Sequence, residues 1–263
     1  MDYDPLRRGF AELVGTFTLV FIGAGAILSF TKLFAAGIAQ GGGDTASGLG
    51  LLGIALAHGL AIAVMVSALG HISGGHFNPA VTFGFLVTRR IAPLLAFTYL
   101  AAQLAGAVFA ALLLRWLFSG QVRDLTNLGA PALGKDVTQW QGLVVEIVLT
   151  FFLVWVVFAT AADPGGTFKS IAGLAIGLTI TLDILMGGPL TGAAMNPARA
   201  FGPQIVQNDW TKCWVWYAGP LAGGGLAALA YEFLYLRPLR PLLPVGPPES
   251  GVVEPRPGET SVT

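Results

Sequence analysis

Long apolar stretches alternate with short polar or glycine-rich connections along the 263-residue chain. A membrane-spanning helix needs about 20 mostly apolar residues to cross roughly 30 Å of hydrocarbon. Because a backbone exposed to lipid must satisfy its own hydrogen bonds, helix is the expected structure for each such stretch. The pattern therefore predicts an all-α membrane protein with six transmembrane helices, over Phe10–Phe34, Gly50–Gly70, Ala92–Phe118, Trp140–Ala162, Ser170–Gly187 and Cys213–Leu236.

Two further segments, His71–Arg90 and Pro189–Lys212, fit neither a spanning helix nor an aqueous loop. Each begins rich in glycine, passes through Asn-Pro-Ala and continues into an apolar run that is too short to span. Irregular backbone at membrane depth is tolerated only where it is buried in protein or lines a wet cavity. We therefore expect two re-entrant half-helices that dip into the membrane.

The two halves of the chain repeat the same order of segments. A span that bears a glutamate, followed later by Asn-Pro-Ala, occurs at Glu12 and Asn78 and again at Glu146 and Asn196. Each half holds three spans, and since three is an odd number the second half must enter the membrane upside down. Inverted repeats place their functional site near the midplane, where interrupted segments meet. We expect one inverted-repeat domain over residues 10–236, with halves at about 10–118 and 140–236.

Composition supports a membrane protein and removes several other classes. Hydrophobic residues make up 54% of the chain and charged residues only 11%, whereas a soluble domain carries about 25% charged residues. The 14 basic and 14 acidic residues balance, so no basic surface indicates a nucleic-acid partner. The single cysteine, Cys213, and three histidines form no metal-ligand pattern. We expect a surrounding lipid bilayer, no nucleic acid, and no metal or cofactor.

The distribution of Lys and Arg predicts the orientation in the membrane. Cytoplasmic connections carry an excess of basic residues, and here that excess lies on the side of the N-terminus. With six spans, both termini then lie in the cytoplasm, beginning with residues 1–9. Residues 237–263 are rich in proline and lack apolar periodicity, which is typical of a disordered tail. We expect an integral protein of the plasma membrane with a Pro-rich cytoplasmic tail.

The Asn-Pro-Ala segments suit the start of a helix. Asn is a favoured N-cap, and Pro is tolerated in the first turn, where its missing N–H would be unpaired anyway. Two such starts that meet end to end each bring roughly half a positive charge. They would repel cations from a narrow lumen, while the Asn amides donate hydrogen bonds to a passing molecule. Caps within a packed core are the alternative, but caps alone do not demand duplication. We predict pore-lining motifs at Asn78, Pro79, Ala80 and at Asn196, Pro197, Ala198.

Several segments carry a resemblance to a known family. They are both Asn-Pro-Ala motifs, 11–16 (Ala-Glu-Leu-Val-Gly-Thr), 70–76 (Gly-His-Ile-Ser-Gly-Gly-His) and 196–203 (Asn-Pro-Ala-Arg-Ala-Phe-Gly-Pro). Together they resemble the aquaporin (major intrinsic protein) family over residues 8–236. The resemblance implies a passive channel for water and small neutral solutes that excludes protons and ions. It also implies a homotetramer in which each subunit forms its own pore, and no catalysis.

Arg199 lies within an apolar stretch. A charge at membrane depth costs at least ~2.5 kcal/mol and usually marks a pathway, although an arginine that satisfies loop carbonyls is the structural alternative. The resemblance makes Arg199 the selectivity-filter arginine, with His58, Ile184 and Ala193 as the other filter positions. This combination is similar to the vacuolar (tonoplast) and aquaporin-eight-like branch, which passes water, ammonia and hydrogen peroxide. Glycerol is disfavoured, since glycerol-passing members carry Asp where this chain has Ala200.

Four other polar residues lie in or near the apolar segments. Glu12 and Glu146 suit either a proton relay or a buttress that fixes the loop before each half-helix, and their matched placement favours the buttress. His76, in the loop expected on the cytoplasmic side, is either a vestibule residue that gates with pH or a residue that orders the loop. Asp183, next to Ile184, has no assigned role.

Other classes of function compete with a channel. A secondary transporter also contains inverted repeats and broken helices, but it needs a coupling-ion site, and the scattered Glu12, Glu146 and Asp183 form no cluster. A structural or junctional membrane protein of low conductance fits the same spans, whereas the intact Arg199 and both motifs favour conduction. No nucleophile–base pair or metal spacing indicates an enzyme.

Overall fold

The computed structural model describes residues 3–35, 43–166 and 169–237, and every regular element in these ranges is helical. The α-helices are α1 (Pro5–Ala35), α2 (Gly43–Ser73), α3 (Pro79–Val87), α4 (Pro93–Leu117), α5 (Gly120–Thr126), α6 (Gln139–Val157), α7 (Ala172–Thr191), α8 (Pro197–Gln207) and α9 (Val215–Tyr231). Short 3₁₀ or π-helical turns follow or precede them, namely η1 (Asn127–Gly129), η2 (Phe158–Ala162), η3 (Lys169–Ile171) and η4 (Glu232–Leu236).

The long helices confirm the predicted all-α membrane fold. Within the described residues, α1, α2, α4, α7 and α6 together with η2 are each long and apolar enough to cross a membrane. The sixth span is α9, whose 17 residues continue without a break into η4. Of the predicted tail, only Arg237 lies inside the described residues.

The helices differ from the predicted segments in three places. α2 begins at Gly43 rather than Gly50, and the connection expected between residues 119 and 139 contains α5 and η1. α7 continues through Pro189, where the re-entrant segment was expected to begin, and ends at Thr191. Proline lacks an N–H and therefore removes one helical hydrogen bond. That loss is tolerable here because the helix stops two residues later, before Gly192 in the left-handed conformation (φ 77°).

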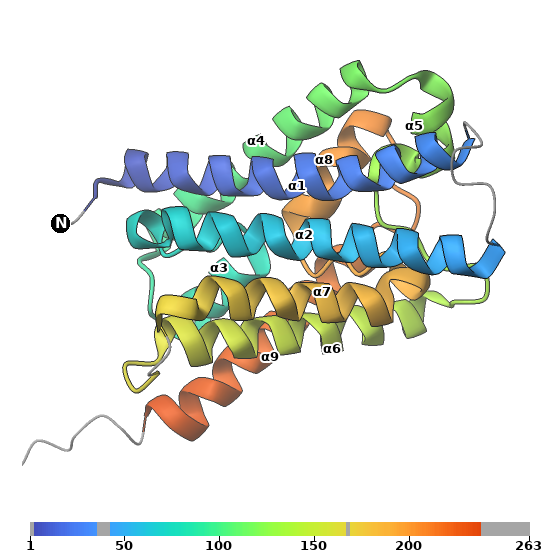
Figure 1. The fold of residues 1–263 in the computed structure, drawn as a ribbon. Coiled ribbons are helices and arrows are strands. Elements are labelled where there is room, and N and C mark those ends of the chain that lie inside the picture. The colour runs from blue at the N-terminus through green and yellow to red at the C-terminus, as the bar shows by residue number, and fades with distance from the viewer. Residues whose placement is uncertain (1–2, 36–42, 167–168, 238–263) are drawn as a thin grey trace, which may run out of the picture.

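The helices form one bundle in which α1, α2, α7 and α6 run side by side (Figure 1). The short helices α3 and α8 lie within this bundle: α3 contacts α9 and α4, and α8 contacts α4. α1 packs along α4 in the first half, as α6 packs along α9 in the second, while α2 and α7 contact each other across the middle. The matched pairs are the arrangement expected of an inverted repeat.

Two glycines set how closely these matched pairs approach. A Cβ at Gly106 of α4 would lie 2.3 Å from the carbonyl oxygen of Leu13 in α1, and one at Gly223 of α9 would lie 2.2 Å from that of Ile147 in α6. Membrane helices approach most closely where side chains are small. Leu13 and Ile147 each follow the glutamate of their half, so both contacts fix the same part of the repeat.

The outer surface of the bundle is apolar and its interior contains polar groups. Leu94 and Trp116 of α4 are about four-fifths exposed, at 80% and 79%, whereas Glu12 and Glu146 are fully buried. This distribution is the reverse of that in a soluble globule, and it suits a protein whose surface faces hydrocarbon.

Candidate functional site

The two half-helices begin in the same way. Asn78 precedes α3 with extended backbone (φ −156°, ψ 122°), and its Oδ1 accepts a hydrogen bond of 2.8 Å from the N–H of Ala80. Asn196 precedes α8 (φ −148°, ψ 108°), and its Oδ1 accepts from the N–H groups of Ala198 and Arg199 at 3.0 and 3.2 Å. In both, Pro follows the cap and opens the helix. Both Asn residues are thus N-caps, as their sequence predicts.

The two caps also bind each other's loop. Asn78 Nδ2 donates to the carbonyl oxygen of Met195, and Asn196 Nδ2 donates to that of Phe77, both at 2.9 Å. These bonds join residues more than a hundred positions apart and place the starts of α3 and α8 against each other. An amide nitrogen carries two N–H groups, so each Asn retains one donor beyond its bond to the opposite loop.

The loops before the caps share an unusual backbone. Phe77 and Met195 both take positive φ (48° and 51°), and so do Gly75 and Ala193 (67° and 43°) at the corresponding places. A non-glycine residue in this region costs roughly 1–2 kcal/mol. Three residues with side chains therefore hold a strained conformation that the surrounding contacts must stabilise.

The carboxylate of Glu12 supplies such contacts in the first half. Its Oε1 accepts from Ser73 Oγ (2.6 Å) and from the N–H of His76 (3.0 Å). Its Oε2 accepts from the N–H of Phe77 (2.6 Å) and from Gln103 Nε2 (2.8 Å). One buried side chain therefore binds the end of α2, the loop and α4.

Glu146 makes the corresponding contacts in the second half. Its Oε1 accepts from Thr191 Oγ1 (2.7 Å) and from the N–H of Ala194 (2.9 Å), and its Oε2 accepts from the N–H of Met195 (2.8 Å). Ser73 and Thr191 are equivalents, as are Phe77 and Met195. Neither carboxylate belongs to the wall of the cavity described next.

A narrow cavity of about 30 Å³ runs past both caps. This volume is enough for individual water molecules but not for bulk solvent. Its wall contains the predicted site residues His58, His76, Asn78, Ile184, Ala193, Asn196 and Arg199. Aliphatic side chains make up most of the rest, namely Leu19, Ile62, Val81, Leu153, Val157, Ile176 and Ile180.

Arg199 is the cationic residue of this wall and is only 2% exposed. Its Nη1 donates to the carbonyl oxygen of Gly129 at 2.9 Å, while its Nε has no hydrogen-bond partner among the described residues. The connection that carries Gly129 is itself tied down, because Asn127 Nδ2 donates to Asp209. Hydrogen bonds from Thr211 and from Asn127 lower the pKa of the Asp209 carboxyl, so this anchor stays ionised at neutral pH.

His58 presents its ring to the same cavity. Its Nδ1 lies 2.9 Å from the carbonyl oxygen of Ile54 in the preceding turn of α2. A carbonyl only accepts, so Nδ1 carries the proton, and in the neutral ring Nε2 is then an acceptor. Nε2 has no hydrogen-bond partner among the described residues, although it is buried.

His76 is packed on several sides. Its Nδ1 lies 3.0 Å from Thr82 Oγ1, and its ring centroid lies 4.5 Å from that of Phe85 and 5.2 Å from that of Tyr99. Tyr99 in turn donates from its hydroxyl to the carbonyl of Ser73. The ring thus borders the cavity while it also packs between α3 and Tyr99 of α4, which binds the end of α2.

Some predicted residues lie outside the cavity wall. Pro79, Ala80, Pro197 and Ala198 are buried behind the caps. Asp183 is 5% exposed, and its Oδ2 has no partner among the described residues.

The aliphatic wall and the role of Gly129 are not predictable from the sequence. Aliphatic residues such as Ile176, Ile180 and Ile184 recur at helical spacing, which is also the pattern of any packed core. No signal in the sequence separates the two. Gly129 belongs to a connection that was expected to be only a polar loop, so its contact with Arg199 was not foreseeable.

Comparison with known proteins shows the family of the chain. The chain matches the family described as Major intrinsic protein over residues 2–231. It is 47% identical to the probable aquaporin TIP3-2 of Arabidopsis thaliana over 89% of this chain and 85% of that protein, and 45% identical to aquaporin TIP4-4 of Zea mays over 89% of each. Its fold is similar to the X-ray structure of the aquaglyceroporin from Plasmodium falciparum, with a TM-score of 0.75 over 90% of this chain and 98% of that one at 23% identity. The chain therefore belongs to the major intrinsic protein (aquaporin) family and is an integral membrane channel that passes water or small solutes passively.

Proposed function

We propose that the cavity conducts water, ammonia and hydrogen peroxide and excludes protons and ions. The observation that carries this proposal is that His58, Ile184, Ala193 and Arg199 line the same cavity as the two helix caps. Molecules that pass one set must pass the other. Solutes move down their own gradients, and no catalysis is involved.

The caps account for the exclusion of charge. Each half-helix start carries roughly half a positive charge, and the bonds between Asn78, Asn196 and the opposite loops hold the two starts together. Cations are repelled at this point. The remaining N–H of each Asn donates to the oxygen of a passing water, which then cannot accept a proton from its neighbour in the file.

The choice of solutes is made at Arg199 and His58. Arg199 Nε is a donor and His58 Nε2 is an acceptor, and neither atom has a hydrogen-bond partner among the described residues. We propose that a small molecule that both donates and accepts exchanges its water contacts for these two. Ile184 and Ala193 supply an apolar and a small wall without a further donor. These four residues suit ammonia and peroxide as well as water. Beyond Arg199 and His58 they offer no polar group to the hydroxyl groups of glycerol.

Glu12 and Glu146 act as buttresses in this proposal. The support is that each accepts the backbone N–H groups of a strained loop while it stays out of the cavity wall. His76 orders the same loop through Thr82 and borders the vestibule, with a pH-dependent gate as the alternative role.

The assembly and location are also proposed. Residues 10–236 form the channel domain, each subunit holds its own pore, and four copies form a homotetramer with both termini in the cytoplasm. An integral membrane location follows from the family. The expected location in the plasma membrane has no support in the comparisons, because the relatives named above are tonoplast intrinsic protein (TIP) aquaporins of plants.

Stopped-flow measurements on proteoliposomes test the proposed solute range. Water, ammonia, hydrogen peroxide, urea and glycerol are compared with empty liposomes, and a proton gradient is followed with an internal dye. We expect permeability to the first three solutes and no dissipation of the gradient. A protein of low conductance would match the empty liposomes for every solute, and a filter open to glycerol would contradict the assignment of Ile184 and Ala193.

A further inference from the structure

The outside of the bundle carries an apolar groove that the channel function does not use. It lies between α3, α4, α8 and α9, holds about 390 Å³ and has almost no polar surface. Thr82 and Tyr217 bring the polar atoms of its wall, and both hydroxyls donate within the protein, to the carbonyl of Asn78 and to Gln204 Oε1. The groove therefore offers an occupant hydrophobic contact alone.

The groove extends from the centre of the membrane towards one interface. Pro79 and Pro197, which open the two half-helices, line its inner end, while Leu86 near the end of α3 lines its outer end. α3 has 9 residues and is therefore roughly 13 Å long, which is close to half of the ~30 Å hydrocarbon layer. At this depth the only abundant apolar ligand is lipid hydrocarbon.

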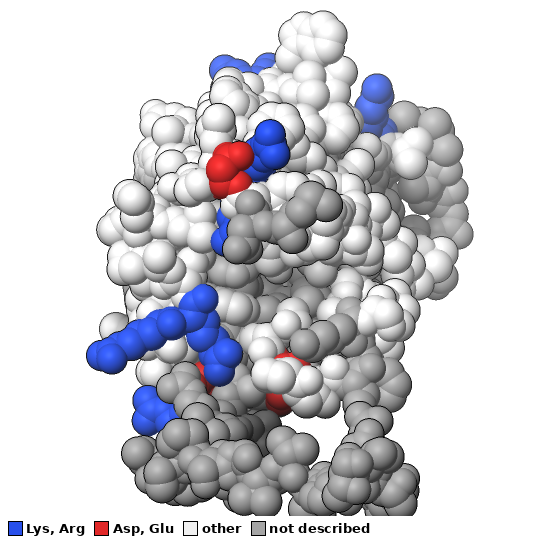
Figure 2. Space-filling model, turned by 90° about the vertical axis from the view of Figure 1, so that its left-hand side faces the viewer, with Lys and Arg blue, Asp and Glu red and all other residues white. Residues whose placement is uncertain are grey.

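A basic pocket adjoins the outer end of the groove. Leu86 belongs to both, and the pocket is completed by Arg89, Arg90 and the residues that lead into α4 at Pro93. It lies at the end of the bundle where α1 begins, and basic side chains dominate the charges visible on that end (Figure 2). An apolar slot beneath a basic pocket matches the division of an anionic phospholipid into tail and headgroup.

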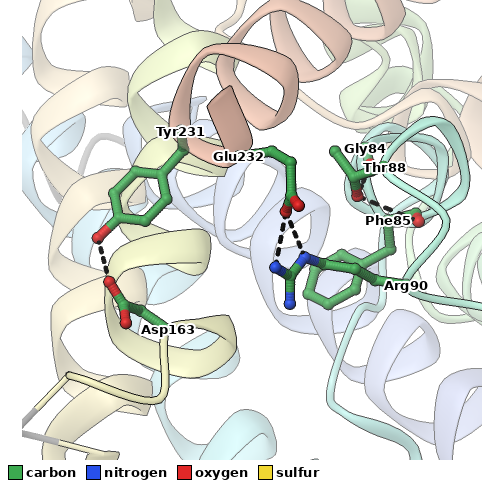
Figure 3. Close-up of polar contacts among 7 residues, drawn as sticks. All are labelled: Gly84, Phe85, Thr88, Arg90, Asp163, Tyr231 and Glu232. Atoms are coloured by element: carbon green, nitrogen blue, oxygen red, sulfur yellow. Dashed lines mark hydrogen bonds and ion pairs between the residues drawn. The ribbon is translucent and has the colours of Figure 1, made fainter. Parts of the chain in front are cut away.

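Only one of the two arginines is available to a ligand. Arg90 Nε and Nη2 both lie 2.7 Å from Glu232 Oε2, and the Glu232 side chain is 5% exposed (Figure 3). No hydrogen bond or ion pair to a described residue is recorded for Arg89, which is exposed. The ion pair between Arg90 and Glu232 joins the connection after α3 to η4 and fixes the pocket, while Arg89 supplies the free positive charge of the pocket.

The backbone at Arg89 shows how that charge is positioned. The N–H of Arg89 donates to the carbonyl of Leu86 (3.0 Å), and the N–H of Arg90 donates to that of Phe85 (2.8 Å). These two bonds form a Schellman motif, in which the position of Arg89 favours glycine. Arg89 nevertheless occupies it with φ 58°, so its side chain projects from the point where α3 ends and the groove reaches the interface.

We propose that this groove and pocket bind one anionic phospholipid, with its phosphate at Arg89 and one acyl chain along α3 and α4. Charge complementarity selects an anionic over a zwitterionic headgroup, since a basic residue near a membrane surface contributes about 1 kcal/mol of attraction, or roughly fivefold in affinity. The acyl chain selects lipid over free phosphate. If this face is cytoplasmic, as the Lys and Arg distribution predicts, it meets the leaflet that holds most anionic lipid.

Native mass spectrometry of the full chain in detergent tests the proposal. The protein is given phosphatidylglycerol or phosphatidylcholine with identical acyl chains, and the fraction with one bound lipid is measured at several concentrations. We expect phosphatidylglycerol to be retained more strongly than phosphatidylcholine. Equal retention of the two lipids would overturn the proposal, and so would saturation by inorganic phosphate alone.

Two variants divide the site into its charged and apolar parts. Arg89→Gln should weaken phosphatidylglycerol roughly fivefold and phosphatidylcholine by less, so that the preference between them shrinks, whereas Leu100→Trp, which fills the groove, should weaken both alike. The matched controls are Arg237→Gln, exposed at the same end of the bundle, and Leu112→Trp, exposed on α4 outside the groove. Equal effects of a variant and its control would overturn the proposal, as would a second copy of the chain that covers the groove. Unchanged water permeability in proteoliposomes shows that each variant is folded.

Discussion

The ring of His58 occupies space that exists only because residue 23 has no side chain. A Cβ at Gly23 would lie 2.3 Å from His58 Cδ2 and 2.5 Å from Nε2. These distances are too short for any real contact, so the proposed filter depends on a glycine of α1 that does not itself line the cavity.

Gly23→Ala should therefore force the His58 ring towards Arg199 and lower the water permeability severalfold. Overpacking of this kind costs about 1–3 kcal/mol, which should also appear as a lower unfolding temperature. Stopped-flow light scattering and thermal unfolding measure the two effects. Gly53→Ala is the matched control, since a Cβ there meets nothing within 4 Å. Full permeability in Gly23→Ala would remove the ring from its assigned place.

Replacing Arg199 with valine should widen the selectivity of the pore. The change removes the buried cation and leaves the carbonyl of Gly129 without its 2.9 Å partner, at a cost of about 1–3 kcal/mol. We expect larger solutes such as urea and glycerol to pass, together with measurable cation currents in a planar bilayer. Arg115→Val, which removes a bond to Val206 at an exposed site, should change neither. Unaltered solute ratios in Arg199→Val would contradict its role as a filter residue.

Ile184→His should reduce the passage of ammonia while it spares water. The new ring adds a donor to the cavity wall. A water with two lone pairs can use it, whereas an ammonia with one lone pair cannot use it in addition to Arg199. One hydrogen bond contributes about 1 kcal/mol net, so the ratio of ammonia to water permeability should fall roughly fivefold. Ile184→Leu keeps the wall apolar and should retain the ratio. Equal ratios in both variants would show that the second filter wall is misassigned.

Glu146→Gln should lower the stability of the channel without any change in the pH dependence of its permeability. An amide has only one acceptor oxygen, so one of the N–H groups of Ala194 and Met195 would face an NH₂ group instead. We expect a loss of about 1–3 kcal/mol, and a similar loss for Glu12→Gln, measured by thermal unfolding in detergent. Asp136→Asn, exposed before α6, is the control. A proton relay would predict the opposite pattern, with normal stability and an altered proton flux.

The sequence predicted the parts of the fold that hydrophobic pattern and cap chemistry determine. The spans follow from apolar length, and the half-helix starts at Asn78 and Asn196 follow from Asn-Pro, which has few other uses within an apolar segment. The buttress bonds of Glu12 were expected only in outline, because a matched position indicates a matched role but not its partners.

The parts that sequence could not supply depend on contacts between distant segments. Gly23 and Gly129 act through His58 and Arg199, and a single glycine gives no indication of what lies against it. Pro189 shows a case in which local preference misleads. Proline predicts the end of a helix, but α7 continues through Pro189 to Thr191 because only one helical hydrogen bond is lost there.

The reciprocal bonds of the two caps bear on how the protein is made. Asn196 is synthesised long after Asn78. The carbonyl oxygen of Phe77 therefore has no hydrogen bond from the Asn196 amide until most of the chain has been made. An unpaired carbonyl within hydrocarbon costs several kcal/mol. The first re-entrant loop should therefore stay hydrated, or outside its final position, while the chain is still being synthesised. The pore is therefore complete only when the second half has been inserted. A truncated chain that ends before α8 lacks the hydrogen bonds between the two half-helix starts and cannot form half of a working channel.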